Sequence, residues 1–399
     1  MKILQINASY KPAFIYGGPT VSVAKLCEEI GFVSVQPASH STQPASHSAQ
    51  PDSHSAQASI VNRQNIEVTV YTTLANGKEE LPYKDGEIKT VDVVEVQYFK
   101  RITKDHSHLS PSLLRHTWKT LKQFDIVHIH AWWNLVSVGV ALICVLKGKR
   151  YILSPRGTLG SYSFYNRKSV VKRIFHTLIG KPLLKQAIFQ VSSSKEKRDI
   201  ENILGDNCQI AIIPNFVELK KAWERDWNVE LQNVRAELLF FSRIEEKKGL
   251  EFLLNACALL NIPYHLTIAG SGEENYISDL ESLGTQLGVD QKITWLGQVS
   301  SESKFDVLAK YDLLILPSYD ENFANVVIES LACGTPVILS PNVGLADYVV
   351  EKKLGWVVEQ NAELIAQKIT SIFENKEGFT TLREKAKETI QHDFAEDVL

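Results

Sequence analysis

Two glutamates with a short, regular spacing mark the segment of this chain best suited to bind a hydroxyl-rich ligand. Glu321 and Glu329 have seven residues between them, within residues 317–338. The segment predicts a buried strand, a short polar loop, a helix, a Gly-Thr-Pro turn and a second buried strand. One acid therefore falls in the loop and the other in the helix, beside the carboxyl end of a parallel strand. Open α/β sheets bind their ligands at that edge.

Helix geometry assigns the two glutamates to different parts of a ligand. Eight positions at about 100° each would leave the side chains about 80° apart if both were helical. We therefore expect Glu321 to act from the loop, on sugar hydroxyls, and Glu329 to act from the helix, on ribose hydroxyls. Amides near Asn325 begin the helix and suit a phosphate. The alternative, two ordinary surface glutamates, fits Glu329 less well because its neighbours are apolar.

Two cations, Arg243 and Lys248, follow the strand predicted at residues 238–242. Cations at the carboxyl end of a strand suit a bound diphosphate, and charge-assisted hydrogen bonds of this kind contribute roughly 1.5–3 kcal/mol each. Gly270 lies in the loop after the next strand, where a glycine lets the backbone approach a ligand closely. Ordinary surface charge and a Gly-rich turn without a ligand remain the alternatives for these residues.

The first half of the chain offers a second set of residues at strand ends. Gly17 and Gly18 follow the first strand and open a helix whose N–H groups suit an anion. His130 ends a strand and could donate to a sugar hydroxyl or to a developing charge. Arg156, after the following strand, could meet phosphate or acceptor. A tight turn without a ligand and a histidine satisfied by backbone carbonyls are the alternatives, and the deeper His128 is expected to be structural.

Alternating strands and helices must position these residues. Short β-rich runs separated by helical patterns are typical of βαβ units and of parallel sheets covered on both faces. A chain of 399 residues is too long for one ordinary core. We therefore predict an α/β fold with two Rossmann-like, doubly wound parallel-sheet domains, residues 1–215 and 216–399, facing a cleft. The predicted strands cover residues 3–7, 66–72, 93–99, 126–130, 151–154, 188–192, 210–213, 238–242, 265–269, 293–296, 313–316, 337–339 and 356–358.

Composition and charge narrow the class of protein. Apolar residues make up 44% and charged residues 22%, as in globular proteins, and a net charge of −3 gives no case for binding nucleic acid. Five cysteines without metal-ligand spacing indicate reduced core residues of a cytoplasmic protein. The N-terminus is a predicted strand and not a signal peptide. The apolar run at residues 135–146 is shorter than the roughly 20 residues that span a membrane, so a buried helix is expected there.

Residues 36–56 hold a tandem heptapeptide repeat, which we expect to be disordered because it has no apolar face to bury. It falls between a helix and a strand, away from the ligand edge, where a long insertion costs little closure entropy. Its histidines, His40, His47 and His54, could bind a metal, but repeat expansion is the better interpretation. A basic stretch at residues 167–185 could form an amphipathic helix at a lipid surface, with a solvated face as the commoner explanation.

Together these residues resemble the retaining nucleotide-sugar glycosyltransferases of group 1 (family 4), which have the GT-B fold. Glu321 and Glu329 match the E-x7-E motif of that family, whose first glutamate contacts the donor sugar and whose second contacts the ribose. Arg243 and Lys248 stand where the family binds the donor diphosphate. His130 matches an active-site histidine. The resemblance covers nearly the whole chain outside the repeat, and it is strongest in the second half.

The resemblance extends to two backbone motifs and includes departures. Gly17 and Gly18 match the glycine loop of the first domain, and Pro214-Asn215 matches the inter-domain link. Ala324 stands where many members have glycine, so the backbone there has less freedom. Arg156 stands where many members have histidine. The sequence stops at Leu399, before the helix that usually crosses back to the first domain, and we expect this to weaken domain closure.

The resemblance implies a retaining glycosyltransferase that moves a sugar from a nucleoside-diphosphate donor to an acceptor hydroxyl. Residues 1–215 would face the acceptor, and residues 216–399 would bind the nucleotide-sugar. Two side-chain cations can balance the diphosphate, so we expect no metal and no cofactor. The predicted catalytic residues are His130, Glu321, Arg243 and Lys248, and Arg156 is predicted on the acceptor side. The predicted donor contacts are Gly17, Gly18, Arg243, Lys248, Gly270, Glu321, Asn322, Phe323, Ala324, Asn325 and Glu329.

The acceptor is expected to be a carbohydrate or lipid-linked molecule in polysaccharide, lipopolysaccharide or glycolipid synthesis. We expect a cytoplasmic protein, with peripheral contact at the inner face of the membrane left open. Two alternatives differ in their products. A nucleotide-sugar epimerase on the same fold would consume donor without an acceptor. A weakened nucleotide-sugar-binding protein, suggested by the repeat and the early stop, would bind donor without turnover.

Overall fold

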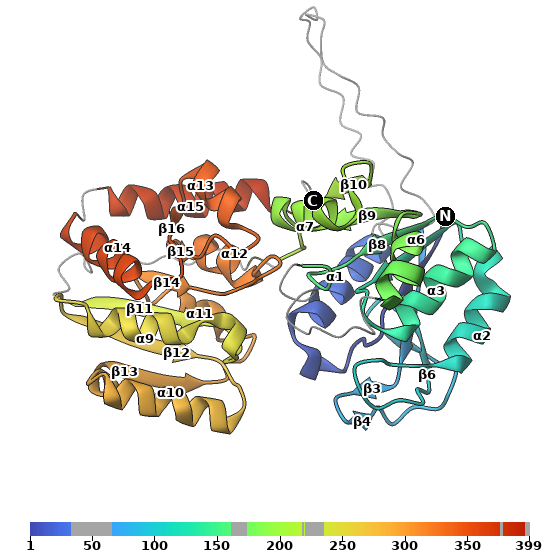
Figure 1. Ribbon diagram of the computed structural model, residues 1–399, viewed down its shortest axis with the longest axis horizontal. Coiled ribbons are helices and arrows are strands. Elements are labelled where there is room, and N and C mark those ends of the chain that lie inside the picture. The colour runs from blue at the N-terminus through green and yellow to red at the C-terminus, as the bar shows by residue number, and fades with distance from the viewer. Residues whose placement is uncertain (33–65, 161–173, 218, 220–234, 376–377, 396–399) are drawn as a thin grey trace, which may run out of the picture. The chain divides into compact units, whose positions relative to one another are not determined.

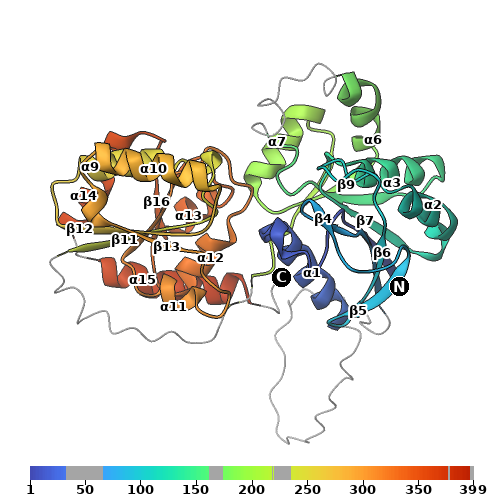
Figure 2. The same cartoon turned by 90° about the horizontal axis from the view of Figure 1, so that it is seen from below.

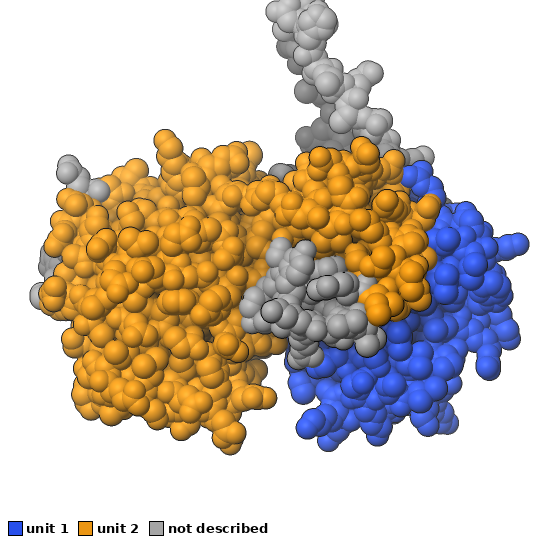
Figure 3. All heavy atoms as spheres, viewed as in Figure 1, with its two compact units in different colours: residues 1–154 blue, residues 155–399 orange. Residues whose placement is uncertain are grey.

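The chain divides into two compact units, residues 1–154 and residues 155–399 (Figure 3). The predicted domain boundary at residue 215 stays a prediction. The heptapeptide repeat and the first part of the basic stretch lie outside the described residues. In the computed structural model (Figure 1), the described residues are 1–32, 66–160, 174–217, 219, 235–375 and 378–395.

The larger sheet has the strand order β10-β9-β8-β7-β1-β2-β6-β5. The pairs β1–β2, β1–β7, β2–β6, β7–β8 and β9–β10 are parallel, and the pair of β5 and β6 is antiparallel. The strand β5 and a small antiparallel hairpin of β3 and β4 were not predicted. The edge strand β5 alternates half-buried and exposed residues, so it lacks the apolar run that marks the central strands. The bounds are β1 (Lys2–Ile6), β2 (Glu67–Thr73), β3 (Ala75–Asn76), β4 (Glu79–Glu80), β5 (Glu87–Val91), β6 (Val94–Phe99), β7 (Ile126–His130), β8 (Tyr151–Ser154), β9 (Ala187–Val191) and β10 (Gln209–Ile212).

The second sheet lies within the second unit and is parallel throughout, in the order β13-β12-β11-β14-β15-β16. Its central strand β14 is buried at every position, as a strand covered on both faces must be. Figure 2 shows α9 and α10 on one face of this sheet and α11 and α15 on the other. The bounds are β11 (Ala236–Phe241), β12 (Tyr264–Ala269), β13 (Ile293–Gly297), β14 (Leu313–Leu316), β15 (Val337–Leu339) and β16 (Gly355–Val357).

Four helices in the described residues begin after a residue whose side chain caps them. Ser110 caps α2, which has Pro111 at its first position, and Asn134, Ser193 and Asn361 cap α3, α7 and α14. The bounds are η1 (Phe14–Tyr16), α1 (Gly18–Phe32), α2 (Pro111–Thr120), η2 (Leu121–Gln123), α3 (Leu135–Leu146), η3 (His176–Gly180), α6 (Lys181–Leu184), α7 (Ser194–Leu204), η4 (Glu246–Lys248), α9 (Leu250–Ala258), α10 (Glu274–Gln286), η5 (Asp290–Lys292), α11 (Lys304–Leu308), α12 (Asn325–Ala332), α13 (Ala346–Lys352), α14 (Ala362–Glu374) and α15 (Phe379–Asp393).

The apolar run that forms α3 is a helix of 12 residues, most of them buried, as expected. Within the described part of the chain, every helix is too short or too polar to span a lipid bilayer. Four of the cysteines are buried and Cys208 is half-buried, and all five are free thiols. This agrees with their prediction as reduced residues.

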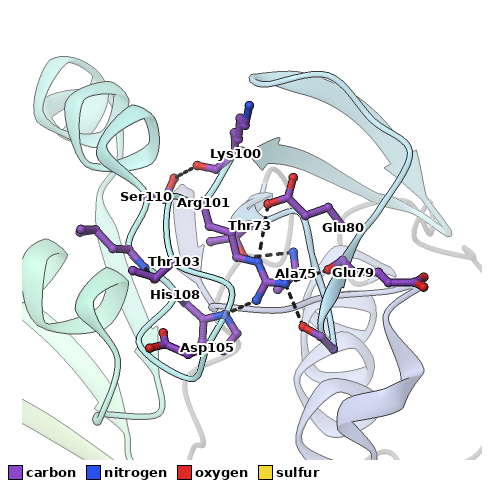
Figure 4. A network of polar contacts seen from close by, with 12 residues as sticks. Thr73, Ala75, Glu79, Glu80, Lys100, Arg101, Thr103, Asp105, His108 and Ser110 are labelled. Atoms are coloured by element: carbon purple, nitrogen blue, oxygen red, sulfur yellow. Dashed lines mark hydrogen bonds and ion pairs between the residues drawn. The ribbon is translucent and has the colours of Figure 1, made fainter.

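A buried arginine joins two loops of the first unit (Figure 4). Arg101 is 2% exposed, and its guanidinium donates to the carbonyls of Gly77 (2.8 Å) and Glu79 (2.7 Å). Another of its nitrogens lies 3.4 Å from Nδ1 of His108, and the Glu80 carboxylate lies 3.7 Å from its Nε. Burial and the neighbouring Arg101 cation lower the pKa of His108 to about 4. The imidazole is therefore neutral at physiological pH and can accept from the guanidinium.

Candidate functional site

Adjacent parallel strands of the second sheet bring the predicted donor residues to one edge. Lys248 follows β11 and Glu321 follows β14, and these two strands pair in parallel. Gly270 follows β12, which pairs with β11 on its other side. The three loops therefore leave the same, carboxyl edge of the sheet, which is the edge where α/β sheets bind ligands.

Lys248 and Glu321 form an ion pair at this edge. Lys248 is 6% exposed, which is rare for a lysine without a partner. The Glu321 backbone is held on both sides, because its N–H donates to the Asn342 carbonyl (3.0 Å) and its carbonyl accepts from Gly344 N–H (2.8 Å). The sequence predicted that Lys248 and Glu321 bind the same donor, which stays a prediction, and the structure shows that they bind each other.

The loop between β14 and α12 reaches the helix through a strained residue. Ala324 precedes α12 with φ 70° and ψ 75°, the left-handed region that favours glycine. Its side chain makes no capping hydrogen bond, so the first amides of α12 receive none from it. A glycine at this position would avoid the steric cost that Ala324 carries. The helix α12 begins at Asn325, after the loop that follows β14, and contact of its first amides with a phosphate stays a prediction.

Glu329 is buried on α12 and pairs with a lysine that was not predicted. Its carboxylate lies 2.6 Å from Nζ of Lys304, the first residue of α11, and Glu329 is only 7% exposed. An ordinary surface glutamate is therefore excluded. The sequence carried no signal for Lys304, because 25 residues separate the two side chains and several other lysines stand as near.

Arg243 and Gly270 are placed differently from the Lys248–Glu321 pair. The Arg243 side chain is 61% exposed, and its guanidinium lies 3.3 Å from the Glu245 carboxylate. Gly270 has φ 145°, and a Cβ there would overlap the Ser242 carbonyl oxygen. Close packing of two loops is thus a sufficient reason for this glycine. Contact of Arg243 and Gly270 with the donor stays a prediction.

In the first unit, His130 is buried inside the sheet. It is 1% exposed, its Nε2 lies 2.7 Å from Oε1 of Gln5, and its ring centroid lies 4.2 Å from that of His128. His128 in turn lies 2.6 Å from the Ser154 hydroxyl. A side chain held in this way has a set orientation, and the catalytic role of His130 stays a prediction.

Gly17 and Gly18 lie where α1 begins, as predicted. Gly17 has φ 67°, so a side chain there would be strained. A Cβ added at either glycine would meet no atom within 4 Å. The two positions therefore border open space, which would allow a ligand to approach the backbone.

Arg156 is connected to the start of α12 inside the second unit. Its guanidinium donates to Oδ1 of Asn215 (3.0 Å), and the Asn215 amide donates to Oδ1 of Asn325 (3.0 Å). The sequence predicted all three as separate features, namely an acceptor-side arginine, an inter-domain asparagine and a helix start. The structure joins them in one chain of hydrogen bonds.

Two models of known protein families match adjacent parts of the chain. Residues 222–392 match the model of the glycosyl transferases group 1, and residues 61–221 match that of glycosyltransferase family 4. The chain is a family 4 glycosyltransferase of group 1. The resemblance to this family is therefore confirmed.

Curated relatives of this glycosyltransferase match parts of it. An uncharacterized glycosyltransferase, MJ1607, of Methanocaldococcus jannaschii is 28% identical over 61% of the chain and 65% of its own length. A D-inositol 3-phosphate glycosyltransferase of Arthrobacter is 34% identical over 31% of the chain and 30% of its own length. The lipopolysaccharide core biosynthesis glycosyltransferase LpsE of Rhizobium meliloti is 31% identical over 49% of the chain and 57% of its own length. The chain thus spans less than two thirds of each.

Solved structures share the fold of this glycosyltransferase over nearly its whole length. The Anabaena protein HepE, solved with UDP and glucose, has a TM-score of 0.68 at 17% identity, and covers 100% of this chain and 96% of its own. WaaG, a glycosyltransferase of lipopolysaccharide biosynthesis, has a TM-score of 0.64 at 14% identity, with coverage of 99% and 96%. The prediction of two parallel-sheet α/β domains with the GT-B fold is confirmed.

Proposed function

We propose that this glycosyltransferase moves a sugar from a UDP-sugar to a hydroxyl of a carbohydrate or lipid-linked acceptor, with retention at the anomeric carbon. The observation that carries the proposal is the ion pair of Lys248 and Glu321 at the carboxyl edge of the second sheet. A buried lysine beside a helix N-terminus suits the charge of a diphosphate. A carboxylate next to it suits the hydroxyls of the attached sugar.

The reaction would require Lys248 to change partner. When the donor binds, its diphosphate competes with the Glu321 carboxylate for the ammonium group, and the released carboxylate accepts hydrogen bonds from the sugar. The acceptor oxygen then bonds to the anomeric carbon as the bond from that carbon to the diphosphate breaks, and the hydroxyl proton passes to the departing diphosphate. Lys248, Arg243 and the first amides of α12 would stabilise the charge that develops on the leaving group.

The names of relatives support the choice of donor and acceptor class. HepE was solved with UDP and glucose, and separately with UDP-glucose. LpsE and WaaG are named for lipopolysaccharide synthesis. We infer from these a UDP-sugar donor and an acceptor in polysaccharide, lipopolysaccharide or glycolipid synthesis. Balance of the diphosphate by side-chain cations, without a metal, is part of the proposal.

We also propose a cytoplasmic location with peripheral contact at the inner face of the membrane. Ile174 and Leu178, at the described end of the basic stretch, are 53% and 70% exposed. Apolar side chains next to basic ones suit an anionic lipid surface. Leu178→Asp should lower the fraction of protein that sediments with vesicles containing anionic lipid, and unchanged sedimentation would count against this contact.

The decisive experiment screens UDP-, GDP- and ADP-sugars with a panel of sugar and lipid-linked acceptors, with and without a metal chelator. Product analysis should show a new glycosidic bond only when the acceptor is present, with the donor's anomeric configuration kept and no loss in the chelator. An isomeric nucleotide-sugar without acceptor would indicate the epimerase instead. Binding of donor without turnover across the panel would indicate a weakened binding protein.

A further inference from the structure

The first turn of α7 and the two serines before it contact the two neighbours of Glu321. The helix and the loop that contains Glu321 belong to the same unit, although about 125 residues of sequence separate them. Asp320, which precedes Glu321, and Asn322, which follows it, each bind side chains from residues 192–199. Neither contact was predicted, although Asn322 is itself one of the predicted donor contacts.

Asp320 is held by a lysine of α7. Nζ of Lys195 lies 2.5 Å from one Asp320 oxygen and 3.0 Å from the Asp199 carboxylate, one helical turn along α7. The other Asp320 oxygen lies 3.4 Å from Nζ of Lys247. Burial alone would lower the pKa of Lys195, but the two carboxylates outweigh it and raise the pKa. Lys195 therefore stays charged, and two cations face two anions in a largely buried cluster.

Asn322 is held by the two serines that precede α7 in the chain. Its side-chain amide donates to the Ser192 hydroxyl (2.9 Å), and the Ser193 hydroxyl donates to its backbone carbonyl (3.0 Å). A Cβ at Gly344 would overlap that same carbonyl oxygen, and one at Gly157 would lie 2.9 Å from the Asn322 side chain. Asn322 is thus both hydrogen-bonded and closely packed.

The first turn of α7 is rigid enough to act as a support. The Ser193 hydroxyl accepts from the N–H of Glu196 (3.2 Å), as in a helix capping box. The Glu196 carboxylate reaches back and accepts from the N–H groups of Ser192 (2.8 Å) and Gly157 (2.8 Å). Glu196 is itself 3% exposed. Lys195 lies in the chain between Ser193 and Glu196, which these hydrogen bonds fix, so its position relative to the loop that contains Glu321 is well determined.

We propose that Lys195 is a positioning residue for Glu321. By holding Asp320, with Ser192 and Ser193 holding Asn322, it sets the backbone on both sides of the glutamate and therefore the direction of the glutamate side chain. This inference rests on the proposed role of Glu321 at the donor sugar. A buried ion pair contributes little net stability, since desolvation offsets the attraction between the charges. Its effect is expected mainly in orientation, and orientation governs rate.

Three variants of α7 test this role. Lys195→Met removes the cation and keeps most of the length of the side chain, Lys195→Arg keeps the charge, and Lys197→Met is the matched control. Lys197 lies on the same helix with its side chain 44% exposed, in a surface pair with Glu201. Lys195→Met should lower kcat for transfer about tenfold to a hundredfold, because misplacement by an ångström has effects of that order. Lys195→Arg should recover most of the rate, and Lys197→Met should match the wild type.

A second readout does not depend on turnover. Amide hydrogen exchange in a peptide covering residues 318–324 should be faster in Lys195→Met than in Lys197→Met, while UDP, which has no sugar, should bind to both with similar affinity. The double variant Lys195→Met/Asp320→Asn has no carboxylate at position 320 that could be left without a cation. It should therefore fold normally but still transfer the sugar slowly. Unchanged exchange in the Lys195→Met peptide, or a double variant with turnover near that of the wild type, would overturn the inference. If the wild type itself transfers no sugar, the proposed function fails, and hydrogen exchange still tests the positioning of the loop.

Discussion

Replacing Glu321 by glutamine should strengthen the binding of UDP while it slows sugar transfer. Glu321 holds the Lys248 ammonium group in this structure. If the same group binds the donor diphosphate, the carboxylate competes with it. Glutamine removes the competing charge and keeps the shape of the side chain, so Lys248 becomes more available to the diphosphate. UDP is the suitable probe because it carries the diphosphate without the sugar that Glu321 is proposed to bind.

The size of the effect follows from the burial of the pair. A charge-assisted hydrogen bond contributes about 1.5–3 kcal/mol. The Lys248 side chain is 8% exposed and that of Glu321 is 19% exposed, so solvent screens the pair in part. We reduce the contribution to about 1–2 kcal/mol for this screening. At about 1.4 kcal/mol for each factor of ten, UDP should bind roughly 5–30 times more tightly to Glu321→Gln.

Isothermal titration calorimetry with UDP measures this change directly. Glu321→Gln should bind more tightly than the wild type, and Lys248→Met should bind more weakly. The double variant Lys248→Met/Glu321→Gln should bind UDP more weakly than Glu321→Gln alone, because it lacks the lysine contact to the diphosphate. Glu281→Gln, an exposed position on α10, is the matched control and should leave affinity unchanged. In the transfer assay, Glu321→Gln should be slower by about 10–150-fold, which corresponds to one lost charge-assisted bond to the sugar.

Two results would refute this reasoning. Weaker binding of UDP by Glu321→Gln would show that the carboxylate supports the diphosphate site and does not compete with it. Wild-type affinity in a folded Lys248→Met variant would remove Lys248 from the diphosphate role. In either case the ion pair would be a structural contact, and the proposed exchange of partners would be wrong.

Two further predictions concern packing and pH. Gly344→Ala should slow sugar transfer and lower the melting temperature, because the new methyl group overlaps the Asn322 carbonyl oxygen. Overpacking of this kind costs about 1–3 kcal/mol. The control Gly284→Ala, whose new methyl group would have one ordinary contact at 3.5 Å, should be close to the wild type in thermal melts and activity. Burial lowers the pKa of His108 to about 4 in the folded protein, whereas an unfolded chain has a His pKa of about 6.5. The neutral imidazole therefore contributes fully to stability above about pH 6.5, and this contribution is lost as the pH falls toward 4. Urea unfolding at several pH values should therefore show a shallower loss of stability over this range for His108→Gln than for the wild type, and equal slopes would contradict the burial argument.

The sequence by itself determined the class of fold and the sheet edge that carries the proposed donor loops. Alternation of apolar strands with helices is a local pattern, and it indicated parallel sheets whose carboxyl edges carry the loops. Glu321 and Lys248 could be placed at one edge because each follows a predicted strand. The sequence predicted less backbone freedom at Ala324, and the left-handed conformation of this residue is known only from the structure. The edge strand β5 escaped prediction because its residues are half polar and largely unburied.

Only the tertiary structure decided which charges pair. Lys247 and Lys248 are neighbours in the chain, yet one contacts Asp320 and the other Glu321. The partners Lys304 and Lys195 come from helices that are distant in sequence from the glutamates they affect. The rotation of each helix about its axis and the order of strands in the sheet select these partners. A sequence pattern specifies which residues face the core, but the energy of an ion pair depends on distance and burial, and both of these arise only when the helices and loops are packed together.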